Sequence, residues 1–160
     1  MSIGPIVYLS NPSDTSTSQM APVGTVRAFI HPTYGYQQYR AVKCAEAGVS
    51  AGIAVVWKSG STTGEVELPA AANAEVNKIA GIAQQAIASG SYGWVLCSGD
   101  GQAMAGEAVT IDNLMFTTGT VGHVDDAATA SAIENAAFGT FITGTASPDA
   151  LVHVRVSGLL

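Results

Sequence analysis

The sequence contains a weak internal repeat built almost entirely from small and apolar residues. Two pairs of segments resemble each other, at spacings of about 54 to 58 residues: 50–57 with 104–111, and 81–96 with 139–154. The second pair is offset by about four more residues than the first, which a loop insertion explains. A repeat of this length indicates a doubled supersecondary unit. Because its shared positions are β-forming and carry nothing catalytic, we interpret the repeat, at about 50–96 and 104–156, as a scaffold.

The composition favours a single β-rich domain. A length of 160 residues suits one domain with a substantial core. Only 11% of the residues are charged while 48% are hydrophobic, and the chain has 18 glycines. Helix-favouring Glu, Lys and Arg are scarce, whereas Thr, Val, Ile, Ser and Gly are abundant, so β structure is expected.

Short runs rich in β-branched and aromatic residues, separated by glycine-rich turns, predict the strands. The expected strands are 25–30, 36–43, 54–58, 65–68, 78–88, 92–97, 109–117, 121–124, 139–143 and 151–156. The apolar spacing of 78–88 also fits a helix, but its short length and flanking glycines favour a strand. The alternation of charged and apolar residues in 65–68 is typical of an edge strand.

The segments between the strands predict turns and a helix. Ser98-Gly99-Asp100-Gly101 predicts a tight turn of the Asp-Gly type. Residues 126–137 predict a short helix that Asp125 or Asp126 caps, and 69–76 a helical turn or a surface loop. Together the elements predict a mainly β, compact barrel or sandwich-like domain over 25–160, with one or two short helices.

The N-terminus, residues 1–24, predicts an extended arm. Residues 10–24 are rich in Ser and Thr and cannot bury enough apolar area alone to offset the entropy of ordering. The apolar Ile6-Val7-Tyr8-Leu9 precedes them. Two interpretations stand: an arm that orders on a partner, and a frayed terminus.

Charge and hydropathy argue against nucleic-acid and membrane partners. The net charge is −6, and the six basic residues are scattered singly, whereas a nucleic-acid binder needs a clustered basic surface. No run is long and apolar enough to span a bilayer, and no secretory signal is present, so we expect synthesis in the cytoplasm. Cys44 and Cys97 are expected to be buried small hydrophobes, and a disulfide between them is left open.

The sequence lacks a recognisable catalytic or metal site. His31, His123 and His153 are isolated and follow no metal-ligand spacing. Dinucleotide, phosphate-loop and serine-nucleophile motifs are absent. We therefore expect no enzyme activity, no cofactor and no metal. Low charge with plentiful Ala, Gly, Val and Thr instead favours association with another subunit over a well-packed monomer.

Residues 45–160 carry a resemblance to a known family. The segments that carry it are Ala80-Gly81-Ile82-Ala83-Gln84, Ser89-Gly90-Ser91-Tyr92-Gly93-Trp94-Val95, Ala105-Gly106-Glu107-Ala108-Val109, Phe138-Gly139-Thr140-Phe141 and Ala150-Leu151-Val152-His153-Val154-Arg155-Val156. Their order is similar to head-decoration (capsid cement) proteins of tailed bacteriophages. The chain departs from that pattern in its N-terminal hairpin, residues 23–43.

The resemblance implies a β-barrel-like protein that binds expanded phage heads as a homotrimer at threefold or local threefold positions. Its partners would then be the major capsid protein and itself, and its location the capsid surface of the virion. We expect partner contacts from the arm residues Ile6, Val7, Tyr8 and Leu9, and from an aromatic patch of Tyr34, Tyr36 and Tyr39. The alternatives are another self-assembling virion component (tail, fibre base or shell) and a small hydrolase, which would need a catalytic constellation that we do not find.

Overall fold

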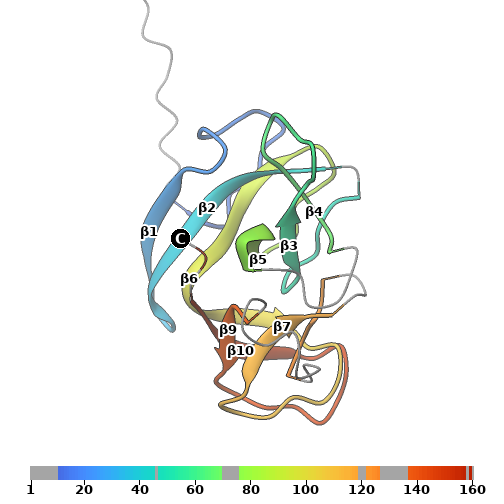
Figure 1. The fold of residues 1–160 in the computed structure, drawn as a ribbon. Coiled ribbons are helices and arrows are strands. Elements are labelled where there is room, and N and C mark those ends of the chain that lie inside the picture. The colour runs from blue at the N-terminus through green and yellow to red at the C-terminus, as the bar shows by residue number, and fades with distance from the viewer. Residues whose placement is uncertain are drawn as a thin grey trace, which may run out of the picture.

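Ten strands pair into one sheet that folds on itself into a sandwich-like body (Figure 1). The computed structural model describes residues 11–45, 47–69, 76–118, 122–126, 137–157 and 159. The strands are β1 (Val26–His31), β2 (Gly35–Cys44), β3 (Ala54–Trp57), β4 (Glu65–Glu67), β5 (Ile79–Ala83), β6 (Tyr92–Met104), β7 (Leu114–Thr117), β8 (Val124–Asp125), β9 (Gly139–Phe141) and β10 (Leu151–Val156). The one helical element in these residues is the 3-10 turn η1 (Val76–Lys78). The predicted mainly β class is confirmed.

The N-terminal hairpin forms as the sequence predicts. β1 and β2 pair antiparallel from Val26 opposite Arg40 to His31 opposite Gly35. In the turn, His31 Nδ1 accepts hydrogen bonds from the backbone N–H groups of Thr33 and Tyr34, at 3.1 and 3.2 Å. The imidazole therefore closes the turn that Pro32 begins.

The predicted tight turn at Ser98–Gly101 is wrong, because β6 runs through it without reversing. The pairing of β6 with β2 slips by one residue between Gln38 and Tyr39, which marks a β-bulge. Gly99 lies beside the slip with a φ of +102°, and a Cβ there would lie 2.6 Å from the carbonyl oxygen of Tyr36. The glycines thus bend a long strand instead of ending a short one.

β4 is also misassigned by its sequence pattern, since it is not an edge strand. It lies between β2, which it pairs in parallel, and β3, which it pairs antiparallel. Val66 is fully buried, while Glu65 and Glu67 stay half-exposed. Alternating burial on an interior strand produces the pattern that we interpreted as an edge.

The strand pairings reveal two equivalent halves. The N-terminal half comprises β2 to β5 with residues 92–97 of β6, and the C-terminal half comprises residues 99–104 of β6 with β7 to β10 (Figure 1). Three pairs in the first half correspond to three in the second: Val55–Gly81 to Met115–Gly139, Cys44–Val66 to Ala105–Val124, and Lys43–Tyr92 to Met104–Leu151. The C-terminal half repeats the pairing of the N-terminal half, and β6 belongs to both.

Turn conformations and hydrogen bonds repeat as well. Residues with positive φ correspond in three places: Gly52 and Asp112, Gly64 and Gly122, and Gly90 and Asp149. The reciprocal backbone hydrogen bonds between Val49 and Ile87 recur between Val109 and Thr145. The strand pairings make Val55 equivalent to Met115. The first segment pair of the sequence repeat, 50–57 with 104–111, instead aligns Val55 with Val109 and is therefore not the structural alignment. The short Ala-Gly runs before β3 and β7 are too alike in composition to fix that alignment.

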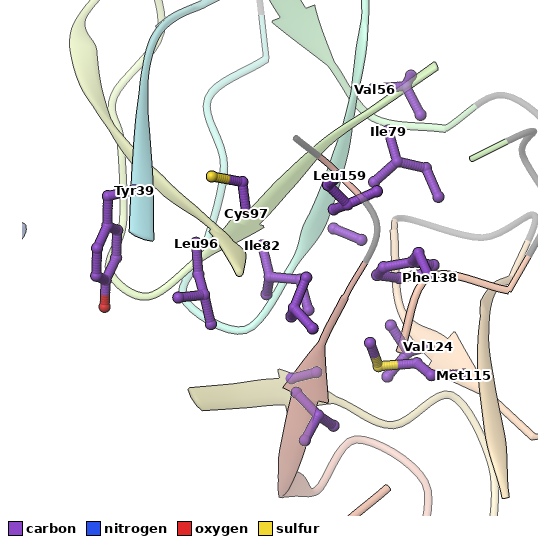
Figure 2. Packing of buried hydrophobic residues seen from close by; sticks show 14 of the residues in the cluster. Tyr39, Val56, Ile79, Ile82, Leu96, Cys97, Met115, Val124, Phe138 and Leu159 are labelled. Carbon is purple, nitrogen blue, oxygen red and sulfur yellow. The ribbon is translucent and has the colours of Figure 1, made fainter. Parts of the chain in front are cut away.

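The buried apolar residues form two clusters: one lies within the N-terminal half, and the other joins the C-terminal half to residues of the N-terminal half. Five buried residues of the N-terminal half have equivalents in the C-terminal half: Val42, Val55, Val66, Ala83 and Val95 correspond to Ala103, Met115, Val124, Phe141 and Val154. The second set packs in one cluster with Tyr39, Trp94 and Leu96 from the outer face of the N-terminal half. Figure 2 shows Phe138 and Met115 near Val124, with Leu159 beside Ile79.

Residues 11–24, the described part of the predicted arm, lie against this body. Asn11 and Asp14 close a turn with a 3.1 Å backbone hydrogen bond, and Ser16 exchanges two backbone hydrogen bonds with Tyr92. Ala21 is buried, and Gly24 donates to the carbonyl of Ala41 at 2.8 Å. Residues 1–10, and with them Ile6, Val7, Tyr8 and Leu9, lie outside the described residues.

The predicted helix at 126–137 falls mostly outside the described residues. Asp126 is described, and its carboxylate accepts hydrogen bonds from the backbone N–H of Thr110 at 2.7 Å and the side-chain amide of Asn113 at 2.9 Å. It thereby fixes the loop before β7. Cys44 and Cys97 are both buried and free, as expected for small apolar residues.

Candidate interaction surface

The exposed apolar surface of the N-terminal hairpin is the first candidate site. Ile30 is 85% exposed and Tyr36 61% exposed, and the two lie directly opposite each other on β1 and β2. Val26, on the same face of β1, is also exposed. We call Val26, Ile30 and Tyr36 the hairpin surface. Single exposed apolar residues are ordinary, but three on one small hairpin indicate a contact surface.

Val26 and Ile30 were not predicted from the sequence, although the alternation of residues along their strand places them on one face. In a strand, residues two apart lie on one face, so Val26, Ala28 and Ile30 face one way and Arg27, Phe29 and His31 the other. Phe29 packs edge-on against Tyr39 with ring centroids 5.5 Å apart, which assigns its face to the core. The alternate face therefore points outward, but the sequence alone does not say which face is which.

The three tyrosines that we predicted as an aromatic patch lie in different surroundings. Tyr39 is buried, and its hydroxyl donates to Gln37 Oε1 at 3.1 Å. Burial raises the pKa of Tyr39 to about 12. Tyr34 is half-buried between His31 and His153, with ring centroids 4.8 and 5.0 Å away. Of the three, Tyr36 is the one that presents most of its surface to solvent.

The C-terminal half exposes a second group of apolar side chains. Ile111, Leu114 and Leu151 are 54%, 44% and 48% exposed. Leu114 corresponds to Ala54, which is fully buried in the N-terminal half. This position of the repeated unit is thus covered in one half and open in the other. We call Ile111, Leu114 and Leu151 the open face of the C-terminal half, and these side chains are the second candidate for a contact with another chain.

Charged side chains beside these surfaces are paired. Arg155 donates to both carboxylate oxygens of Asp100, at 2.6 and 3.0 Å. Its guanidinium holds the pKa of Asp100 below the usual range, with the nearby His153 adding to the effect. On the other half, Lys43 donates to Glu65 at 2.7 Å and lowers the pKa of that carboxyl. His153 and Arg155 share one face of β10, as the alternation predicts.

The histidines serve structural contacts in the described part of the chain. His123 Nδ1 lies 3.3 Å from a carboxylate oxygen of Asp149. His31 caps its own turn and stacks on Tyr34. Among the described residues, no three His, Cys, Asp or Glu side chains gather as metal ligands would. Those residues also include no helix with the length and apolar character of a membrane span.

Comparison with known proteins reveals a shared fold. No protein-family model matches the sequence, and no curated protein matches it significantly. The crystal structure of the head fibre gp8.5 N base of bacteriophage phi29 superposes with a TM-score of 0.55 and 15% identity, over 83% of this chain and 95% of that one. The two chains share a fold. At this identity the likeness speaks for the architecture alone.

Proposed function

We propose that the protein is a structural component of a tailed-bacteriophage virion that binds the outside of the expanded capsid and stabilises it. The observation that carries the proposal is the fold shared with the N base of a phage head fibre over nearly the whole of that chain. The exposed hairpin surface and the open face of the C-terminal half supply surface for contacts. The proposal assigns the protein no catalytic role.

Stabilisation follows from mass action. A protein that binds the assembled, expanded shell and not its separated subunits stabilises the shell by RT ln(1 + [L]/Kd) at each site, where [L] is the free concentration of the bound protein. A homotrimer at threefold or local threefold positions has three copies that bind adjacent capsid subunits at the same time. The arm residues Ile6, Val7, Tyr8 and Leu9 add a segment that orders on a partner, which costs part of the binding free energy but extends the contact.

Co-sedimentation with expanded, undecorated heads of the same phage tests this proposal. We expect saturable binding with a number of copies that matches the threefold sites. Ile30→Asp, which places a charge on the hairpin surface, should weaken binding about tenfold or more. Thr62→Asp, on the exposed turn between β3 and β4, is the matched control and should bind normally. Absence of binding at micromolar concentration would remove the proposal.

A fibre base is the second candidate function, and the description of the phi29 chain as the N base of a head fibre favours it. A fibre base binds the head and also carries a fibre formed by further residues. Under this alternative, electron microscopy of virions should show fibres rooted at the position of the protein. Smooth heads with bound protein favour a decoration protein instead.

A further inference from the structure

The outer edge of β1 has no partner strand among the residues that the structure describes. β1 is the first strand in the sheet order and pairs only with β2. Its six residues therefore present unpaired backbone N–H and C=O groups along one side. Proteins usually cover such an edge or blunt it with charge, because it is a template for another strand. Here Ile30 lies on the edge strand with 85% of its surface exposed.

A groove runs beside this edge. Residues 28–32 line it together with Asn11, Pro12 and Gln37 of β2, and its volume is about 670 Å³. Its walls are mainly apolar, from Ala28, Phe29 and Ile30, and no Lys, Arg, Asp or Glu lines it. The groove and the open edge together suit an extended apolar peptide, which binds by backbone hydrogen bonds and by side chains that enter pockets.

The chain itself carries such a peptide immediately before the described residues. Residues 3–9, Ile-Gly-Pro-Ile-Val-Tyr-Leu, are uncharged, and Ile6-Val7-Tyr8-Leu9 has the β-branched and aromatic character of a strand. These seven residues are enough to span the six residues of β1. Asn11, where the described chain begins, lines the same groove. Pro5 is compatible with an edge position, which needs no N–H on its outer side.

We propose that residues 3–9 of a neighbouring copy pair with the free edge of β1 as an added strand. The direction in which the segment would run along β1 favours the segment of a neighbouring copy over that of the same chain. Asn11 lines the groove at the His31 end of β1, and the Asn11–Asp14 turn reverses the chain there. The chain's own segment would therefore run parallel to β1, whereas a neighbour's segment is free to form the slightly more stable antiparallel pairing.

The proposed exchange also leads to a closed assembly. Each copy donates a segment and receives one through a different surface, so the contact is heterologous and closes into a ring when the rotation permits. Ten extended residues reach roughly 33 Å, enough to cross to an adjacent copy. The inference deepens the self-association within the proposed function, and it does not depend on whether the ring binds a phage head.

Mixed cross-linking tests the exchange. One full-length variant carries Val7→Cys and the other carries Ile30→Cys, and the two are mixed and treated with a short bis-maleimide. The native Cys44 and Cys97 are 2% and 0% exposed, so they do not compete in the folded protein. We expect a cross-linked dimer that contains one chain of each variant. Thr62→Cys in place of Ile30→Cys is the control and should give none.

Outcomes that contradict the exchange are equally definite. A double variant, Val7→Cys with Ile30→Cys, that cross-links only within one chain assigns the edge to the chain's own segment and overturns the proposal. No cross-link in either arrangement overturns it as well. In sedimentation without heads, full-length Val7→Asp should associate about tenfold more weakly than the wild type, while Ser2→Asp should not differ. A wild-type protein that forms the exchanged ring yet fails to bind heads would refute head binding alone.

Discussion

Gly81 and Gly139 hold the same position in the two halves of the fold. Each lies opposite the second residue of a four-residue strand, Val55 or Met115. At each glycine, the nearest atom to an added Cβ would be a carbonyl oxygen of the next strand, that of Leu96 or Arg155. Leu96 and Arg155 are themselves equivalent, because they pair with the residues that follow the two glycines. Close approach of three strands at one point is thus a requirement of the repeated unit.

Alanine at either glycine should be severely destabilising. We expect Gly81→Ala and Gly139→Ala each to lower the free energy of unfolding by about 3 kcal/mol, since backbone atoms have no room to move aside. Gly60→Ala is the control: its φ is +75° with nothing within 4 Å of an added Cβ, so about 1 kcal/mol is expected. Urea denaturation measures all three. Equal losses at the three positions would contradict the packing argument.

Asp100 should make stability depend on acid pH. Its pKa lies below the ordinary 3.8 in the folded protein, so the ionised form favours folding. This contribution is present above the unfolded pKa of about 3.9 and is lost as the pH falls through the lower folded value. Asp100→Asn should therefore unfold more easily than the wild type at pH 7 and differ little at pH 2. A difference of the same size at both pH values would exclude the Arg155 pair as its cause.

Tyr39 should limit stability in alkali. Its pKa is raised to about 12 in the folded protein, so the neutral phenol favours folding. That contribution is complete below pH 10 and is lost as the pH rises from 10 to 12. Tyr39→Phe should cost about 1 to 2 kcal/mol at pH 7, because Gln37 Oε1 loses its partner, and this deficit should shrink by pH 12. Tyr36→Phe, at an exposed position, is the control and should cost little at pH 7.

The two cysteines should be inert in the native protein. Burial raises the pKa of both the Cys44 and the Cys97 thiols, and the thiolate is the reactive form. Ellman's reagent at pH 8 should therefore modify neither until the protein is unfolded, when two thiols per chain should react. Fast reaction of one thiol in the native state would mean that the region around it opens to solvent.

Strand positions could be predicted where alternation is strong. The pattern over 151–156 and the hairpin turn around Pro32 gave their elements with the correct bounds or within a residue or two. The repeat was also visible in the sequence, and Gly81 with Gly139 is a pair that the strand registers bear out. The alternation of apolar and polar residues and the steric limits at glycine decide these features. Both can be recognised within a short stretch of sequence.

Features set by distant contacts could not be predicted. Gly99 and Gly101 have the composition of a turn, but both lie within β6, where Gly99 pairs with Gln37 just beyond the slip against β2 and Gly101 pairs with Val154. The alternation of Glu65 and Glu67 with Val66 resembles that of an edge strand. It arises because one face of the interior strand β4 is buried and the other is only half-buried. The tyrosines were grouped by their spacing, but Tyr39 enters the core against Phe29, which belongs to another strand.

The shared strand β6 has a consequence for how the chain unfolds. Residues 92–97 of β6 form the last strand of the N-terminal half, and residues 99–104 form the first strand of the C-terminal half. The two stretches belong to one continuous strand of 13 residues. Fraying of either half removes hydrogen-bond partners from the strand on which the other half depends. The two halves are repeats in pattern, but because they share β6 we expect that neither folds or melts by itself and that the body loses its structure in a single cooperative step.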